Sequence, residues 1–244
     1  MVLAGVAGLG GVCSGLIRGL GEHKICGVNE KQWTPEQSEF VQKYFHKEVL
    51  TRLMPFLIEK DSDLPNLTDD AIYLAIYMVK KENQKKRFAL LEIPTNVLPR
   101  FIVLPEKDDD KFVMFIDDII RSGLKEILFI FDFDEFSAYT IKLTKDAELE
   151  IVDDISESYI DKLSRSLQQR KWGTPVRFIY DRDMPDDLLK ILTKKLRFSP
   201  DDVTIPANRY HNYKDFMKLP NLGRKRFNYE PQLQIPHREK KGRA

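Results

Sequence analysis

The sequence predicts an α+β fold, a mixed β-sheet with helices mainly on one face, and three observations lead to it. Residues 136–146 alternate between two sets of side chains, which is the period-2 pattern of a half-buried strand. Capped helices and shorter strands alternate on both sides of this strand, so helices must cover its apolar face. The chain has 244 residues, 42% of them hydrophobic, which is enough for a substantial core. We expect Tyr139, Ile141 and Leu143 to point into that core.

Charge and cysteine content exclude several function classes. Lys and Arg (39) nearly balance Asp and Glu (38), so no overall field draws the chain to nucleic acid or to an anionic membrane. Any anion site must therefore be local. The two cysteines, Cys13 and Cys26, provide neither a disulfide framework nor a four-ligand zinc site. A reducing, cytoplasmic location fits this cysteine usage.

Glycine and charge patterns divide the chain into three parts. Eight of the twelve glycines lie between Gly5 and Gly27, which makes residues 1–21 a Gly-rich leader without an assigned role. This stretch lacks the basic flank of a signal peptide, and its glycines fit poorly to a membrane span, so we expect no integral membrane segment. Residues 22–220 form the predicted domain. Residues 221–244 are polar and basic, as in a linker or tail.

A helix is predicted to begin at Thr34. Thr34 can cap it, Pro35 suits the first turn and Gln37 completes a capping box. Apolar residues then recur every three or four positions until Pro55, which predicts one helix face packed on the core.

Short strands and a second helix follow. Residues 72–79 and 87–93 are predicted to form a hairpin with a basic turn, and residues 101–104 and 111–115 to continue the meander. Asp117 and Asp118 are interpreted as acidic residues at the start of a short helix. Asp132 and Asp134 could place two carboxylates on one side of an extended segment, as magnesium binding requires. No third oxygen ligand is evident, so a solvated strand edge is favoured.

Beyond residue 146 the pattern alternates helix and strand. We expect a helix after Ser156, a strand at 176–180, a helix after Pro185 and a last strand at 203–206. A right-handed crossover would make the strands at 139 and 176 parallel neighbours.

The segment 208–216 interleaves basic, aromatic and amide side chains. Arg182, Arg209, His211 and Lys214 are candidate contacts for a polyanion, because the strands before them are expected to end at one side of the sheet. The alternative is that Arg209 and Lys214 pair with acidic residues such as Asp215 or Asp183. Tyr210, Tyr213 and Phe216 are candidate interface residues, expected to be exposed. No catalytic or metal-binding residue is assigned.

Several motifs resemble the second, or head, domain of bacterial polyphosphate kinase. The similarity extends over about residues 22–236 and rests on these runs: Leu90-Leu91-Glu92-Ile93-Pro94, Leu98-Pro99-Arg100-Phe101, Thr144-Lys145-Asp146-Ala147-Glu148, Val176-Arg177-Phe178-Ile179-Tyr180, Arg182-Asp183-Met184-Pro185 and 208–216.

The resemblance implies an enzyme that transfers the terminal phosphate of ATP to polyphosphate, with ATP and magnesium as the cofactors of the full-length protein. In that family the phosphorylated histidine lies in two C-terminal domains that this chain does not contain, and none of the four histidines (His23, His46, His211 and His237) matches its position.

The head domain is implied to form a homo-oligomer, to contact those catalytic domains and to shape the path of the polymer. The chain alone is expected to be inactive and to bind no nucleic acid. The alternative is a stand-alone, non-catalytic interaction or scaffold module.

Overall fold

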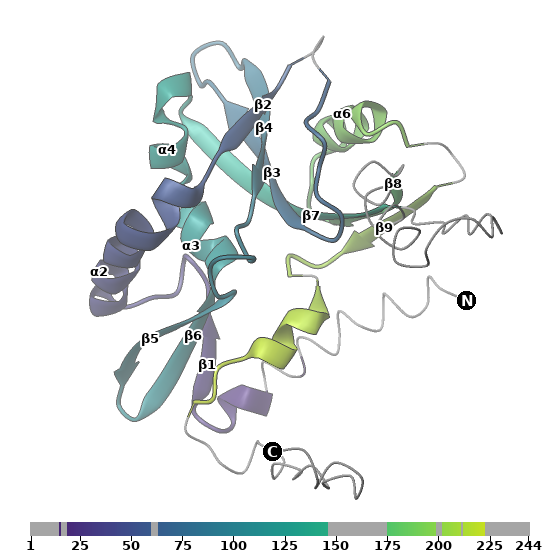
Figure 1. Ribbon diagram of the computed structural model, residues 1–244. Coiled ribbons are helices and arrows are strands. Elements are labelled where there is room, and N and C mark those ends of the chain that lie inside the picture. The colour runs from purple at the N-terminus through teal and green to yellow at the C-terminus, as the bar shows by residue number, and fades with distance from the viewer. Residues whose placement is uncertain are drawn as a thin grey trace, which may run out of the picture.

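Two mixed β-sheets organise the chain in the computed structural model, which describes residues 15, 19–59, 63–145, 175–198, 202–210 and 212–222 (Figure 1). The larger sheet has six strands in the order β2 (Pro55–Ile58), β4 (Lys86–Glu92), β3 (Ile72–Val79), β7 (Glu135–Lys145), β8 (Pro175–Asp181) and β9 (Val203–Ala207). The smaller sheet has three, in the order β1 (Ile25–Val28), β6 (Asp110–Phe115) and β5 (Phe101–Lys107). The predicted α+β class with a mixed sheet is confirmed.

Strand β7 lies inside the larger sheet and is buried on both faces. Ile141 and Leu143 are fully buried in one core, as predicted. The opposite face is not solvated, however, because Phe136 and Ala138 pack against a second core and Thr140 is fully buried. The interpretation of β7 as half-buried was therefore incomplete.

The direction of β8 differs from the prediction. Strand β8 runs antiparallel to β7, with Ile141 opposite Tyr180 and Leu143 opposite Phe178. The parallel pair in the larger sheet is instead β8 and β9, which are connected through α6 (Asp186–Lys195). The crossover argument therefore applies one strand later in the chain than we expected. The helix predicted after Ser156 lies outside the described residues.

The predicted hairpin exists, and the two strands that were expected to continue the meander form a second hairpin in the other sheet. Strands β3 and β4 pair antiparallel around a turn closed by the Lys80 N–H donating to the Lys85 carbonyl at 2.9 Å. Strands β5 and β6 also pair antiparallel, yet they do not continue the meander, because β6 pairs in parallel with β1. The four-residue strand β1 was not predicted from the sequence.

The first helix begins as predicted. The Thr34 Oγ1 accepts from the Gln37 N–H at 3.3 Å, and the Gln37 side chain accepts from the Thr34 N–H at 3.0 Å, so both halves of the capping box form. Helix α2 (Pro35–Tyr44) continues through a π-helical turn (Phe45–Val49) and a 3-10 turn (Leu50–Arg52) before Pro55 begins β2.

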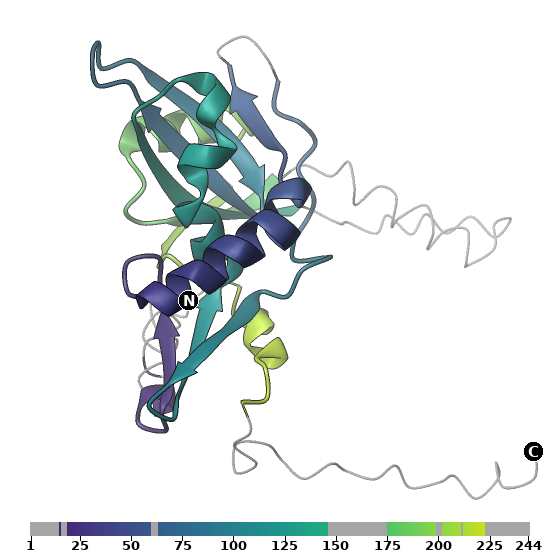
Figure 2. The same ribbon diagram turned by 90° about the vertical axis from the view of Figure 1, so that its left-hand side faces the viewer.

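The helices lie mainly on one face of the larger sheet. Helices α2, α3 (Ile116–Ser122) and α4 (Leu124–Ile127) enclose the core on that face, and Figure 2 shows α2 crossing in front of it. On the opposite face α6 contributes Leu188, Leu192 and Leu196 to the core around Phe178. Two 3-10 turns complete the described elements, Phe129–Phe131 and η4 (Tyr213–Lys218). None of the described helices is long and apolar enough to cross a bilayer.

Gly123 links α3 to α4 at a point of close packing. A Cβ atom at this position would lie 2.3 Å from Cζ of the buried Phe45 ring, and the ring cannot move away without disturbing the core. We therefore expect Gly123→Ala to lower the free energy of unfolding by about 1–3 kcal/mol in chemical denaturation. The same substitution should cost less in a Phe45→Leu background, where the ring is absent.

Gly21→Ala is the matched control, because nothing lies within 4 Å of a Cβ atom there. Equal effects of Gly123→Ala with and without Phe45 would show that this contact does not constrain α3 and α4.

Candidate functional site

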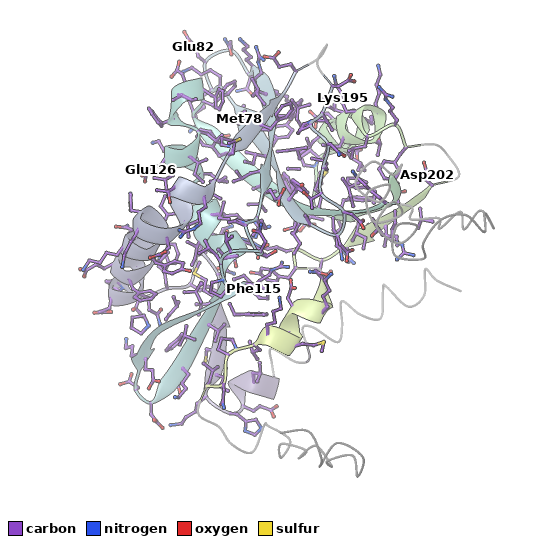
Figure 3. The ribbon with its side chains drawn as sticks, viewed as in Figure 1. Met78, Glu82, Phe115, Glu126, Lys195 and Asp202 are labelled. Carbon is purple, nitrogen blue, oxygen red and sulfur yellow. The ribbon has the colours of Figure 1, made fainter. Side chains whose placement is uncertain are left out.

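The segment that follows β9 crosses the junction between the two sheets. Strands β8 and β9 are parallel, so Arg182 and Arg209 follow them at the same end, and the Arg182 N–H donates to the Ala207 carbonyl at 2.9 Å. The chain then passes through η4 towards the smaller sheet, as Figure 1 shows. Phe115, labelled in Figure 3, marks the place where this segment meets β6.

Two buried carboxylates on α3 form the centre of this junction. Asp117 and Asp118 lie in the first turn of α3, as predicted, and both are also fully buried in ion pairs, which was not predicted. Arg100 donates to both oxygens of Asp117, from Nε at 3.0 Å and from Nη2 at 3.1 Å. Asp118 accepts from Arg121 and from Arg209, each at 2.7 Å, and from the Tyr210 hydroxyl. Asp117 and Asp118 thus form ion pairs that link α3 to other segments of the chain.

Arg209 connects three separate parts of the chain. Besides Asp118 it pairs with Glu30, which follows β1. Burial is the largest single influence on Glu30 and would raise its pKa, but the hydrogen bond from Arg209, a backbone hydrogen bond and the charges of Arg209 and Arg121 together lower it. Burial also disfavours the charge of Arg209, yet its two carboxylate partners raise the pKa of the guanidinium above its usual value. Burial and the neighbouring Asp118 charge raise the pKa of the Tyr210 hydroxyl.

A second branch of the junction runs through Asp215 to the larger sheet. Asp215 pairs with Arg100 and accepts from Asn212 Nδ2 at 2.9 Å. Lys142 of β7 donates to the Asn212 side chain at 2.9 Å and pairs with Asp70 at 2.9 Å. Lys214 also pairs with Asp70, at 2.7 Å. Burial of Asp70 would raise the pKa of its carboxyl, but the two lysines lower it.

We name these ten charged side chains the junction cluster. Its carboxylates are Glu30, Asp70, Asp117, Asp118 and Asp215, and its cations are Arg100, Arg121, Lys142, Arg209 and Lys214. Five negative and five positive groups leave it without net charge. Such an arrangement positions elements, because each charge is already held by an opposite one.

The structure separates the four predicted anion contacts. Arg209 and Lys214 pair inside the domain, as the alternative interpretation held, although their partners are Asp118, Glu30 and Asp70 rather than Asp215 or Asp183. Arg182 is exposed, with no side-chain partner among the described residues. His211 lies outside the described residues. Contact of these four residues with an anion stays a prediction.

Two of the predicted interface aromatics point inwards. Tyr210 stacks on Phe115, with ring centroids 4.3 Å apart and planes at 11°. Phe216 packs against Phe101 and Phe115, with centroids 5.3 and 6.0 Å apart. The expectation that both are exposed is therefore wrong, since they are half-buried in the core of the smaller sheet. The Tyr213 side chain lies outside the described part of the structure, and the interface role of the three stays a prediction.

The two carboxylates examined for magnesium have local partners. Asp132 pairs with Lys80 at 2.9 Å, and Asp134 accepts from the Lys81 N–H at 2.8 Å. Within the described ranges, no group of three His, Cys, Asp or Glu side chains is arranged to hold a metal ion.

Asp118→Ala should destabilise the protein strongly, because it leaves the buried Arg121 and the partly buried Arg209 without their common carboxylate. We expect the free energy of unfolding to fall by about 3–5 kcal/mol, measured by urea denaturation. Lys214→Ala removes an exposed ion pair of similar length and should cost less than about 1 kcal/mol. Similar costs for the two substitutions would contradict the assignment of the buried pairs as the stabilising part of the junction cluster.

Comparisons with known proteins give the family of this fold. The family model described as polyphosphate kinase middle domain matches residues 36–219. The polyphosphate kinase of Vibrio vulnificus (strain YJ016) is 42% identical over 213 residues, which cover 86% of this chain and 30% of that protein. The polyphosphate kinase of Escherichia coli (strain K12) is 36% identical over 231 residues, 93% of this chain and 33% of that protein.

A solved structure agrees with these sequence relatives. The crystal structure of polyphosphate kinase from Porphyromonas gingivalis superimposes with a TM-score of 0.71 at 26% sequence identity, covering 90% of this chain and 31% of that one. The chain thus spans about a third of the length of the curated relatives it matches. It belongs to the polyphosphate kinase family and corresponds to the middle domain of that family.

Proposed function

We propose that this chain is the head-domain portion of a polyphosphate kinase, an enzyme that transfers the terminal phosphate of ATP to polyphosphate. The match to the family's middle domain and the coverage of about a third of each relative support this assignment. ATP and magnesium would be the cofactors of the full-length enzyme. The usage of only two cysteines supports a reducing, cytoplasmic location.

Within that enzyme we propose a non-catalytic role in dimerisation and in shaping the path of the polymer. The observation that supports the non-catalytic part of this proposal is the charge balance of the junction cluster. Phosphoryl transfer needs cations aimed at the charge that develops on the transferred group. Here Arg100, Arg121 and Arg209 are aimed at buried carboxylates of the same domain. The cluster is therefore suited to hold the segment after β9 in a fixed position relative to the sheets.

The proposal predicts that the chain alone is catalytically silent. Incubation of the purified chain with ATP, magnesium and a polyphosphate primer should give no polymer growth, whereas a full-length relative run in parallel provides the positive control. With γ-labelled ATP, no histidine should carry label that survives base and is lost in acid. Such a label on any of the four histidines, or growth of polymer, would overturn the non-catalytic role.

The proposed role in dimerisation predicts that sedimentation of the purified chain shows concentration-dependent dimers. A strict monomer at high micromolar concentration would count against a self-sufficient interface.

A further inference from the structure

A groove on the face of the larger sheet that carries α6 shares no residue with the junction cluster. It lies between the end of β2, the start of β4 and the last turns of α6, and it encloses about 580 Å³. A volume of this size is typical of small-molecule sites, which range from about 300 to 1,000 Å³. Lys195, labelled in Figure 3, lies at the α6 side of the groove.

The floor of the groove is apolar. Ile58, Phe88 and Ile191 form it, from β2, β4 and α6. The Phe88 ring is held edge-on against Tyr77, with centroids 5.1 Å apart and planes at 70°. Ile58 is almost fully buried, whereas Phe88 and Ile191 are only partly covered. An apolar, partly aromatic surface is thus open within the groove.

The rim of the groove is basic. Lys86, Arg87, Lys194 and Lys195 contribute four positive charges, against Glu59 on the same rim. Lys86 is engaged by Asp187 at 2.9 Å, and the pair between Arg87 and Glu59 is long, at 4.0 Å. The two lysines of the last turn of α6 also complement its helix dipole. That effect explains neither the cations from β4 nor the open apolar floor.

A floor and a rim of this kind call for a ligand with two parts. An inorganic anion would leave the apolar floor exposed to water, and a purely apolar ligand would leave uncompensated the excess positive charge of the rim, where four cations face Glu59 and Asp187. We propose that the groove binds a nucleoside di- or triphosphate, with the base on Phe88 and Ile191 and the phosphates against Arg87 and Lys194. This site goes beyond the proposed function and does not depend on it.

The test is a fluorescence titration of the 244-residue chain with N-methylanthraniloyl-ATP. The wild-type chain should show saturable binding. The double variant Arg87→Glu/Lys194→Glu should bind the probe about tenfold more weakly or worse, since charge-assisted contacts to phosphate are lost.

The double variant Lys125→Glu/Lys190→Glu is the matched control. It makes the same change in net charge at exposed lysines outside the groove, and Lys190 lies on the same helix. Lys194→Gln, which removes one exposed charge, provides a milder variant, and thermal melts establish that each variant is folded.

Competition experiments separate a nucleotide site from a general anion site. Unlabelled ATP should displace the probe at lower concentration than tripolyphosphate, because only the nucleotide covers the apolar floor. Three results would each overturn the proposal: no saturable binding at millimolar probe, equal weakening by the groove and control variants, or equal displacement by tripolyphosphate and ATP.

Discussion

Two adjacent carboxylates buried at the start of α3 are the constraint on which the arrangement of the sheets depends. A buried charge is costly unless an opposite charge and good hydrogen bonds accompany it. Asp117 and Asp118 therefore require cations. Arg121 comes from the last turn of the same helix, whereas Arg100, which precedes β5, and Arg209, which follows β9, come from other segments of the chain. The ion pairs of these two carboxylates therefore hold the smaller sheet, helix α3 and the segment after β9 together.

Local patterns predicted much of the fold, and tertiary contacts decided the rest. The capping box at Thr34 and the periodicity of β3, β4 and β7 are properties of neighbouring residues, so the sequence alone was sufficient to find them. The pairing of β1 with β6 and the direction of β8 depend on contacts between segments far apart in the chain, which no local pattern records.

The candidate site illustrates the same limit. The pairs at 117–118 and 186–187 look alike in sequence, and Asp187 does lie in the first turn of α6, where it meets Lys86 and Tyr77. Asp117 and Asp118 differ only because other elements cover the start of α3. A usable signal was present: Arg100 and Arg121 each adjoin bulky apolar residues, a setting in which a charged side chain needs a buried partner. In the basic segment 208–216, Arg209 and Lys214 form ion pairs inside the domain, so basic residues in a sequence can indicate internal pairing.

The central claim is that Asp118 and Arg209 stabilise the domain through each other, and a double-mutant cycle measures this directly. Asp118→Ala, Arg209→Ala and the double variant would be compared by urea denaturation with the corresponding cycle for Asp70 and Lys214. The account predicts a coupling energy above about 1.5 kcal/mol for the Asp118–Arg209 pair, whose carboxylate is fully buried, and below about 1 kcal/mol for the exposed Asp70–Lys214 pair. A coupling energy near zero between Asp118 and Arg209 would contradict it.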